Sequence, residues 1–298
     1  MKYLPFLFIL ILSSCSSYKN MPLNSSADVY PPPGTTTISE NLFLDKTEVT
    51  NFHWLEYSNW LKKVYGEDSE VFKSSIPNEE AYTAVYSQNI NGNPIELIHP
   101  AYREYPVVGI SYQQALDYSK WRSDRVMENF LVEKGILSLP HSSHKDSIFT
   151  IEKYFKGQYL NIQPSKEILF YPKYSLPNAE NFKKASQFTD SLYTAFIQTS
   201  KGKKYAKLND RNCMGKTSDS TQIGPSPVNS QLNNKKLKIS HLNGNIREMT
   251  AIEGEFFGLS YMDSCEIKDD KIIKDDNLVN SYTGFRNICT FQEWNGQY

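Results

Sequence analysis

Apolar residues recur at helical spacing soon after the first polar segment of the chain ends. A short apolar run at residues 42–44 comes first and is typical of a strand. Thr50 and Asn51 then stand where a helix needs a capping side chain. The apolar positions of the predicted helix are Trp54, Tyr57, Trp60 and Leu61. We therefore predict a strand followed by a helix whose aromatic stripe packs into a core.

A second strand and helix are predicted between residues 105 and 130. Residues 105–112 are mostly apolar, which indicates a short buried strand. Ser111 and Gln114 have the S-x-x-Q spacing of a capping box, so we expect a helix to begin there. A third helix is expected after Asn178, which can cap it, and this helix would carry Phe182 and Ala185 inward.

The remaining stretches show no strong periodicity. Residues 66–93 and 189–234 are expected to be mostly loops, and residues 131–174 look like an insertion. The charges at residues 266–276 indicate a solvated hairpin. Together the patterns predict an α+β fold, a single domain with few long helices, short strands and many ordered loops.

The first residues of the chain read as a targeting segment. Residues 3–12 are apolar, which is too short a run to span a bilayer core of about 30 Å. Small residues directly before Cys15 resemble a bacterial lipoprotein signal, so we expect residues 1–14 to be removed and Cys15 to be acylated. An ordinary secretory signal is the alternative. Residues 15–37, with three consecutive prolines, predict an extended tether before a domain at residues 38–298.

The net charge and the cysteine content limit which partners and which disulfides can be expected. A net charge of -1 gives no electrostatic reason to expect a nucleic acid partner. Cys213, Cys265 and Cys289 lie beyond the targeting segment, and disulfides persist in exported proteins. Three cysteines allow one disulfide and one free thiol, but the sequence leaves the pairing open.

Several motifs together resemble a known family. They are residues 46–51 (KTEVTN), 105–121 (YPVVGISYQQALDYSKW), 244–250 (GNIREMT), 258–262 (GLSYM) and 284–286 (GFR). The chain resembles the formylglycine-generating, sulfatase-modifying factor family. This resemblance implies a fold related to C-type lectins, with little regular secondary structure.

The resemblance also implies where the family's chemistry would lie. Family enzymes oxidise a peptide cysteine with two cysteines that hold copper(I), and these positions fall here at Asp263 and Lys268. A carboxylate and an ammonium do not replace soft thiolates, so we expect neither copper nor catalytic residues. Ser260 matches the family's active-site serine. Ser260, Asp263, Cys265 and Lys268 would therefore form a vestigial active-site region, in which we expect Cys265 to form a disulfide with Cys289.

The turn of the GN motif has two interpretations. In the family, equivalent positions supply calcium ligands, which here would be the carbonyls of Gly244 and Ile246 and the carboxylate of Glu248. His241 stands where the family has an acid or amide, and it is a poor ligand for calcium. The alternative is that Glu248 is a buried hydrogen-bonding residue that fixes the turn. No other cofactor is expected.

The sequence predicts a lipid-anchored, non-catalytic scaffold or binding protein of the bacterial cell envelope. Its expected location is the outer membrane of a Gram-negative bacterium, held there by acyl chains and in contact with envelope proteins. It resembles lipoproteins of this family that are linked to gliding motility and type IX secretion. The alternative is a formylglycine-generating or related oxidoreductase with a non-standard site that uses Cys265 and Ser260. A lectin-like sugar binder is a third hypothesis, by analogy of fold alone.

Overall fold

The chain forms two four-stranded sheets with helices on either side of the first. The computed structural model describes residues 30–86, 100–138, 148–199, 212–213, 224–231, 238–266 and 272–296. The first sheet has the strand order β1-β2-β8-β3 and is antiparallel, and the second has the order β6-β5-β4-β7 with β4 and β7 parallel. The strands are β1 (Thr35–Ser39), β2 (Leu42–Asp45), β3 (Phe170–Ser175), β4 (Arg247–Met249), β5 (Glu255–Phe257), β6 (Ile272–Lys274), β7 (Thr283–Gly284) and β8 (Ile288–Glu293).

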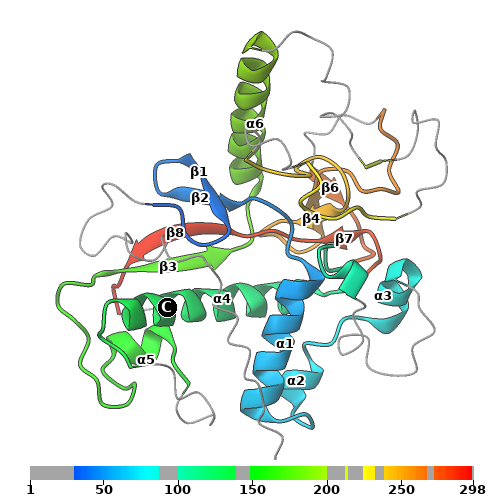
Figure 1. Cartoon of the computed structure of the whole chain (residues 1–298). Helices are drawn as coiled ribbons and strands as arrows, with labels where there is room; N and C mark the ends of the chain where they lie inside the picture. The colour runs from blue at the N-terminus through cyan, green and yellow to red at the C-terminus, as the bar shows by residue number, and fades with distance from the viewer. Residues whose placement is uncertain are drawn as a thin grey trace, which may run out of the picture.

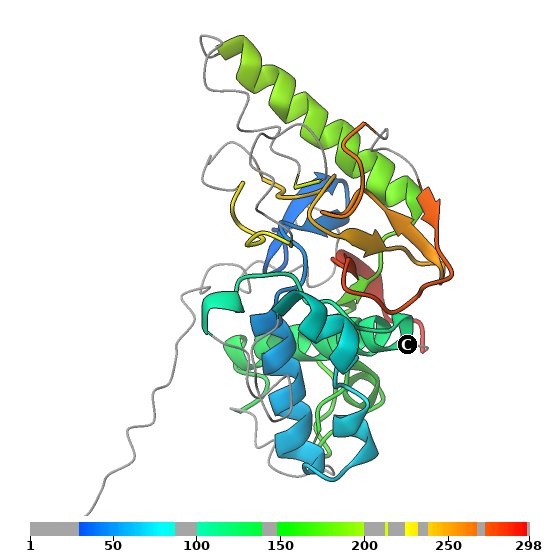
Figure 2. The same cartoon turned by 90° about the vertical axis from the view of Figure 1, so that its right-hand side faces the viewer.

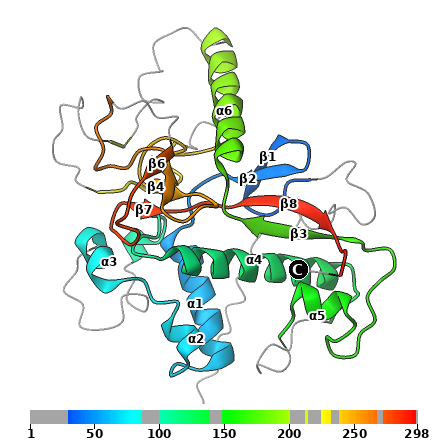
Figure 3. The ribbon, with the colours of Figure 1, turned by 180° about the vertical axis from the view of Figure 1, so that it is seen from behind.

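Helix α4 lies lengthwise beneath β3 and β8, and α1 stands crosswise near one end of α4 (Figure 1). Helix α6 projects from the end of the molecule that lies opposite α1 and α2 (Figures 2 and 3). Within the described ranges, no helix is both long and apolar enough to cross a membrane. The helices are α1 (Asn51–Tyr65), α2 (Glu70–Lys73), α3 (Glu79–Tyr86), the 3-10 helix η1 (Pro100–Tyr102), α4 (Tyr112–Glu133), α5 (Ile151–Phe155) and α6 (Ala179–Thr199). This mixture of short strands, helices and loops confirms the predicted α+β class.

The helix starts predicted from capping residues are confirmed. Thr50 caps α1, where its hydroxyl accepts the His53 N–H at 3.1 Å. Ser111 and Gln114 form the predicted capping box of α4, since Gln114 Oε1 accepts the Ser111 N–H at 2.7 Å. Asn178 accepts the N–H of Asn181 at the start of α6. Side-chain oxygens thus satisfy N–H groups that a helix start otherwise leaves without partners.

Two segments expected to be loops contain helices. Residues 66–93 include α2 and α3, which are held by burial of Phe72 and of Tyr82 and Tyr86. Helix α6 runs to Thr199 and so extends into residues 189–234, which were expected to be mostly loop. Short helices with one or two buried side chains give too little periodicity to be recognised in a sequence.

The strand expected at residues 105–112 does not form. One isolated bridge joins Thr50 to Pro106, and the N–H of Val107 donates to the Val49 carbonyl at 2.9 Å. The segment is buried as expected, with Val108 and Ile110 fully enclosed. Pro106 has no N–H to offer to a neighbouring strand, and beyond this one bridge the segment forms no ladder.

Three further boundaries differ from the sequence prediction. The expected insertion at residues 131–174 contains α5 and most of β3, which pairs with β8 along six positions. In the charged stretch at residues 266–276, β6 pairs with β5, and residues 267–271 lie outside the described residues. Strand β1 begins at Thr35, three residues before the expected start of the domain at residue 38.

The aromatic stripe of α1 forms the centre of one core cluster. Trp54 is fully buried, stacks on Tyr118 of α4 with ring centroids 5.6 Å apart, and meets Phe285 edge-on at 6.3 Å. Its Nε1–H donates to the Ser75 carbonyl at 2.9 Å. Trp54 therefore joins α1, α4 and the segment between β7 and β8 in one packed unit.

We predict that Trp54→Ala lowers the free energy of unfolding by about 3–5 kcal/mol, because it leaves a cavity among the rings of Tyr57, Tyr118 and Phe285 and an unpaired carbonyl. Urea denaturation followed by circular dichroism measures this change. Ile252→Ala is the control, since Ile252 is 58% exposed and its truncation should cost less than about 0.5 kcal/mol. An equal loss of unfolding free energy in both variants would show that Trp54 stabilises the core no more than an exposed residue does.

Candidate functional site

The three C-terminal motifs lie side by side in the second sheet. Strand β4 carries the GN motif, β5 leads directly into the Gly258 motif, and β7 contains the glycine of the GFR motif. Glu248 of β4 stands opposite Phe257 on one side and Gly284 on the other. A Cβ at position 284 would lie 2.5 Å from the Val107 carbonyl oxygen, so only glycine fits there.

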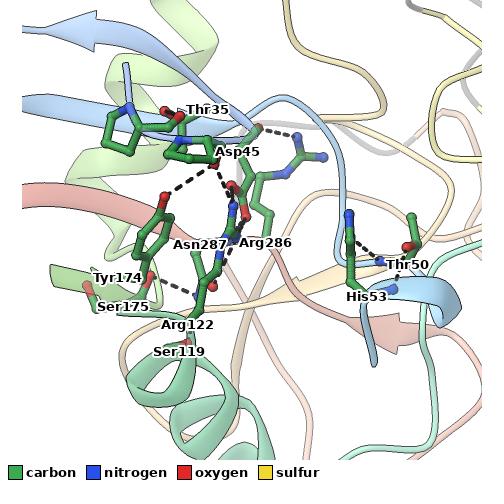
Figure 4. A network of polar contacts seen from close by, with 12 residues as sticks. Thr35, Asp45, Thr50, His53, Ser119, Arg122, Tyr174, Ser175, Arg286 and Asn287 are labelled. Atoms are coloured by element: carbon green, nitrogen blue, oxygen red, sulfur yellow. Dashed lines mark hydrogen bonds and ion pairs between the residues drawn. The ribbon is translucent and has the colours of Figure 1, made fainter. Parts of the chain in front are cut away.

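A buried arginine holds these motifs together. The guanidinium of Arg286 is completely buried and makes two hydrogen bonds of 2.6 Å to the two carboxylate oxygens of Glu248. It also donates to the carbonyls of Asp45, Ser240 and His241 at 2.9–3.2 Å. Figure 4 shows Arg286 reaching the Asp45 backbone from below β2. Because each nitrogen of the guanidinium has an acceptor inside the protein, it ties β2, the turn at His241 and β4 to one point.

Glu48 adds a second carboxylate to the same guanidinium. Its Oε2 lies 3.9 Å from Arg286 Nη2, and its Oε1 accepts a hydrogen bond from Asn245 Nδ2 at 2.9 Å. Burial raises the pKa of Glu48 to about 8, although Arg286 opposes the shift and Glu248 adds to it. The two 2.6 Å bonds make Glu248 the anionic partner of Arg286, and Glu48 is the protonated acid at neutral pH.

Asp263 lies at the centre of a second polar cluster. Arg247 Nε donates to Asp263 Oδ2 at 2.9 Å, and the Ser260 hydroxyl and N–H donate to the same oxygen at 2.8 and 2.7 Å. Arg247 also forms an ion pair with Asp275 at 2.7 Å. Burial alone would raise the pKa of Asp263, but the bonds from Arg247 and Ser260 outweigh it and hold the pKa below its usual range. Ser260 is therefore bonded to a carboxylate that is itself neutralised.

The expected disulfide between Cys265 and Cys289 is wrong. Cys265 is bonded to Cys213, 52 residues earlier in the chain, with 5.4 Å between the Cα atoms. Cys289 is a free thiol in β8, completely buried, and burial raises its pKa well above the usual value. Cys265 lies in a turn after β5 of the second sheet, whereas Cys289 lies in β8 of the first sheet, so the fold does not bring the two together.

The residues of the vestigial region do not fit copper. Asp263 offers a hard carboxylate engaged by Arg247 and Ser260, and Cys265 has no thiol because it is in a disulfide. Among the described residues, no group of three or more His, Cys, Asp or Glu side chains could hold a metal. Lys268 and the lipidation candidate Cys15 lie outside the described residues.

The residues of the GN turn do not fit calcium either. Both carboxylate oxygens of Glu248 are bonded to the guanidinium of Arg286, and a second cation beside it would be repelled. The Gly244 carbonyl accepts the N–H of Ile246 at 2.9 Å. This geometry favours the interpretation of Glu248 as a buried residue that fixes the turn.

A third polar network was not predicted from the sequence. Arg122 of α4 binds both carboxylate oxygens of Asp45 at 2.7 and 2.8 Å and donates to the Pro33 carbonyl at 3.0 Å. Asn287 donates its N–H to Asp45 and its side-chain amide to Ser119. Figure 4 shows these side chains converging between β2 and α4. Arg122 and Asp45 are 77 positions apart in the sequence. Sequence motifs relate only nearby residues, so they could not predict this network.

The sequence matches a family model. The model described as the sulfatase-modifying factor enzyme 1-like domain matches residues 16–257. No curated protein matches the chain. Among solved structures, one titled "Crystal Structure of CarF" is similar, with 19% identity over 84% of this chain and 86% of that chain and a TM-score of 0.45. The domain match covers most of the chain, including the motifs around Asn51, Ser111 and Asn245.

We predict that the stability of the protein falls as the pH rises from 6.5 to 8. The folded state holds a proton on Glu48 that the unfolded state has already released above pH 4.5, so folding becomes less favourable up to pH 8. The loss over this window should be about 1–2 kcal/mol. Glu48→Gln, which mimics the protonated acid, should remove most of it in denaturation curves recorded at each pH.

Burial lowers the pKa of His241 to about 4. The effect of His241 on stability therefore lies mainly below the pH range of 6.5 to 8. Glu253→Gln is the matched control, because Glu253 is exposed in a turn. Its stability should fall with pH as steeply as that of the unchanged protein. A Glu48→Gln variant with the same slope would show that Glu48 is ionised in the folded state.

Proposed function

Because this chain belongs to the sulfatase-modifying factor enzyme 1-like domain family, we propose that it is a non-catalytic member of that family. It acts as a lipid-anchored scaffold or binding protein of a bacterial cell envelope. The observation that carries this proposal is the bonding of Asp263 to Arg247 and Ser260 at the position where the family's chemistry needs a thiolate.

The loss of catalysis follows from the chemistry of the side chains. Oxidation of a peptide thiol by the family's route needs two soft thiolates that bind copper(I). Cys265, the thiol nearest to Ser260 in the sequence, is consumed in a disulfide with Cys213. The bonds from Arg247 and Ser260 hold the pKa of Asp263 below its usual range, so this carboxylate is a poor base for activating Ser260.

The proposed location in the envelope is supported by the start of the sequence. An apolar run ends in Ser13-Ser14-Cys15, and a proline-containing tether of the kind that holds a domain away from a membrane follows. The disulfide between Cys213 and Cys265 agrees with an oxidising compartment. Within the envelope, the chain's resemblance to family lipoproteins of gliding motility and type IX secretion favours a place in such an assembly, on the outer membrane.

We predict that the protein neither binds copper(I) tightly nor consumes oxygen in the presence of a cysteine-containing peptide. A copper(I) competition titration and an oxygen electrode measure the two quantities. A family enzyme that retains both cysteines is the positive control. Oxygen uptake with stoichiometric peptide oxidation would instead support the oxidoreductase alternative.

We also predict that Cys15→Ser prevents lipid attachment. Cells fed labelled palmitate should incorporate the label into the unchanged protein and not into the variant, which should leave the membrane fraction. Cys289→Ser is the control, because this buried thiol lies far from the processing signal in the sequence. Label in the Cys15→Ser protein would exclude the proposed anchor.

A further inference from the structure

A pocket lies between α1 and α4, at the end where the chain passes from β2 into α1. Its volume is about 410 Å³, within the range of about 300–1,000 Å³ that small-molecule sites occupy. On one wall, His53, Glu56 and Trp60 follow helical spacing along α1. On the other wall, Trp121 and Arg125 follow it along α4. We call this the α1–α4 pocket, and none of the three C-terminal motifs contributes to its lining.

The walls of the pocket are aromatic. Trp60 and Trp121 lie with ring centroids 6.2 Å apart, and Tyr118 lies 5.6 Å from Trp121. Both tryptophans are only partly buried, so part of each ring is accessible. Aromatic rings of this kind attract cations and also pack against alkyl chains.

The positive charges in the pocket are already matched by carboxylates of the protein. Arg122 is engaged by both oxygens of Asp45. Arg125 forms an ion pair with Glu128 at 3.0 Å, and its guanidinium lies over the ring of Trp60 at 4.7 Å. His53 adds no charge, because its Nδ1 accepts the Thr50 N–H, as a neutral imidazole does.

Negative charge is left over in the pocket. Glu56 is exposed to solvent in the pocket and has no ion pair or hydrogen bond within the described residues. Glu48 also lines the pocket, but burial raises its pKa to about 8, so it adds no negative charge there at neutral pH. The pocket thus combines aromatic walls with one carboxylate, that of Glu56, that lacks a cation of its own.

We propose that the α1–α4 pocket binds an organic ammonium ion on an alkyl chain, such as the side chain of a lysine. The ammonium group lies beside Glu56, and the alkyl chain lies against the rings of Trp60 and Trp121. The carboxylate supplies the charge, and the rings supply both a cation–π contact and an apolar surface. A neutral ligand would leave Glu56 without a partner, and an anion would be repelled.

Titration of the full chain in detergent with Nα-acetyl-lysine amide tests this assignment, with calorimetry as the measurement. Nα-acetyl-norleucine amide has the same chain without the ammonium group and should bind about tenfold more weakly or not at all. Added salt should weaken the lysine complex, because Glu56 is exposed. Equal binding of the two amides, or no binding of either at millimolar concentration, would overturn the proposal.

Glu56→Gln locates the site. It should weaken binding of the lysine amide about tenfold, while Glu133→Gln, a matched change of an exposed glutamate on α4 outside the pocket, should leave it unchanged. Both substitutions are on the surface, so thermal melts should be the same. Unchanged binding in Glu56→Gln would refute the site. A second titration with 1,5-diaminopentane distinguishes the sources: tighter binding of the amide assigns a peptide lysine, and tighter binding of the diamine assigns a free polyamine.

Discussion

The ion pair of Arg286 with Glu248 is the interaction on which the arrangement of the two sheets depends. Arg286 lies between β7 of the second sheet and β8 of the first, and its guanidinium contacts β2, β4 and the turn at His241. A charge buried this deeply is tolerable only with an opposite charge and a full set of acceptors. Both are present, so the position of the guanidinium fixes the relative placement of segments that lie up to 241 residues apart.

The same requirement limits what the C-terminal cluster can do chemically. The carboxylate that satisfies Arg286 cannot also hold a cation, and the carboxylate that satisfies Arg247 cannot serve Ser260 as a base of ordinary strength. Charge in this part of the protein is used to hold the backbone in place. Glu56 is different, because it stands beside aromatic rings and no side chain in the described residues neutralises it.

The sequence predicted those features that depend on neighbouring residues. The caps at Thr50, Ser111 and Asn178 and the α+β class could be recognised because a helix start is decided within four residues. Pairings between residues far apart in the sequence could not be predicted. The disulfide of Cys265 with Cys213 and the ion pair of Arg122 with Asp45 depend on which loops pass beside each other in the fold. Periodicity and spacing carry no information about that.

Two departures from the family's sequence pattern are explained by one contact. The resemblance of the motifs sets Arg247 against a tryptophan of the family and Asp263 against its first copper-binding cysteine. The two side chains form an ion pair whose members are 15% and 9% exposed. Removal of either member would leave the other charge mostly buried, with only Asp275 beside Arg247 or only Ser260 beside Asp263, and a buried charge that loses its ion-pair partner is costly. The two substitutions therefore depend on each other, and replacing only Asp263 by cysteine would leave Arg247 with Asp275 alone and would not restore a copper site.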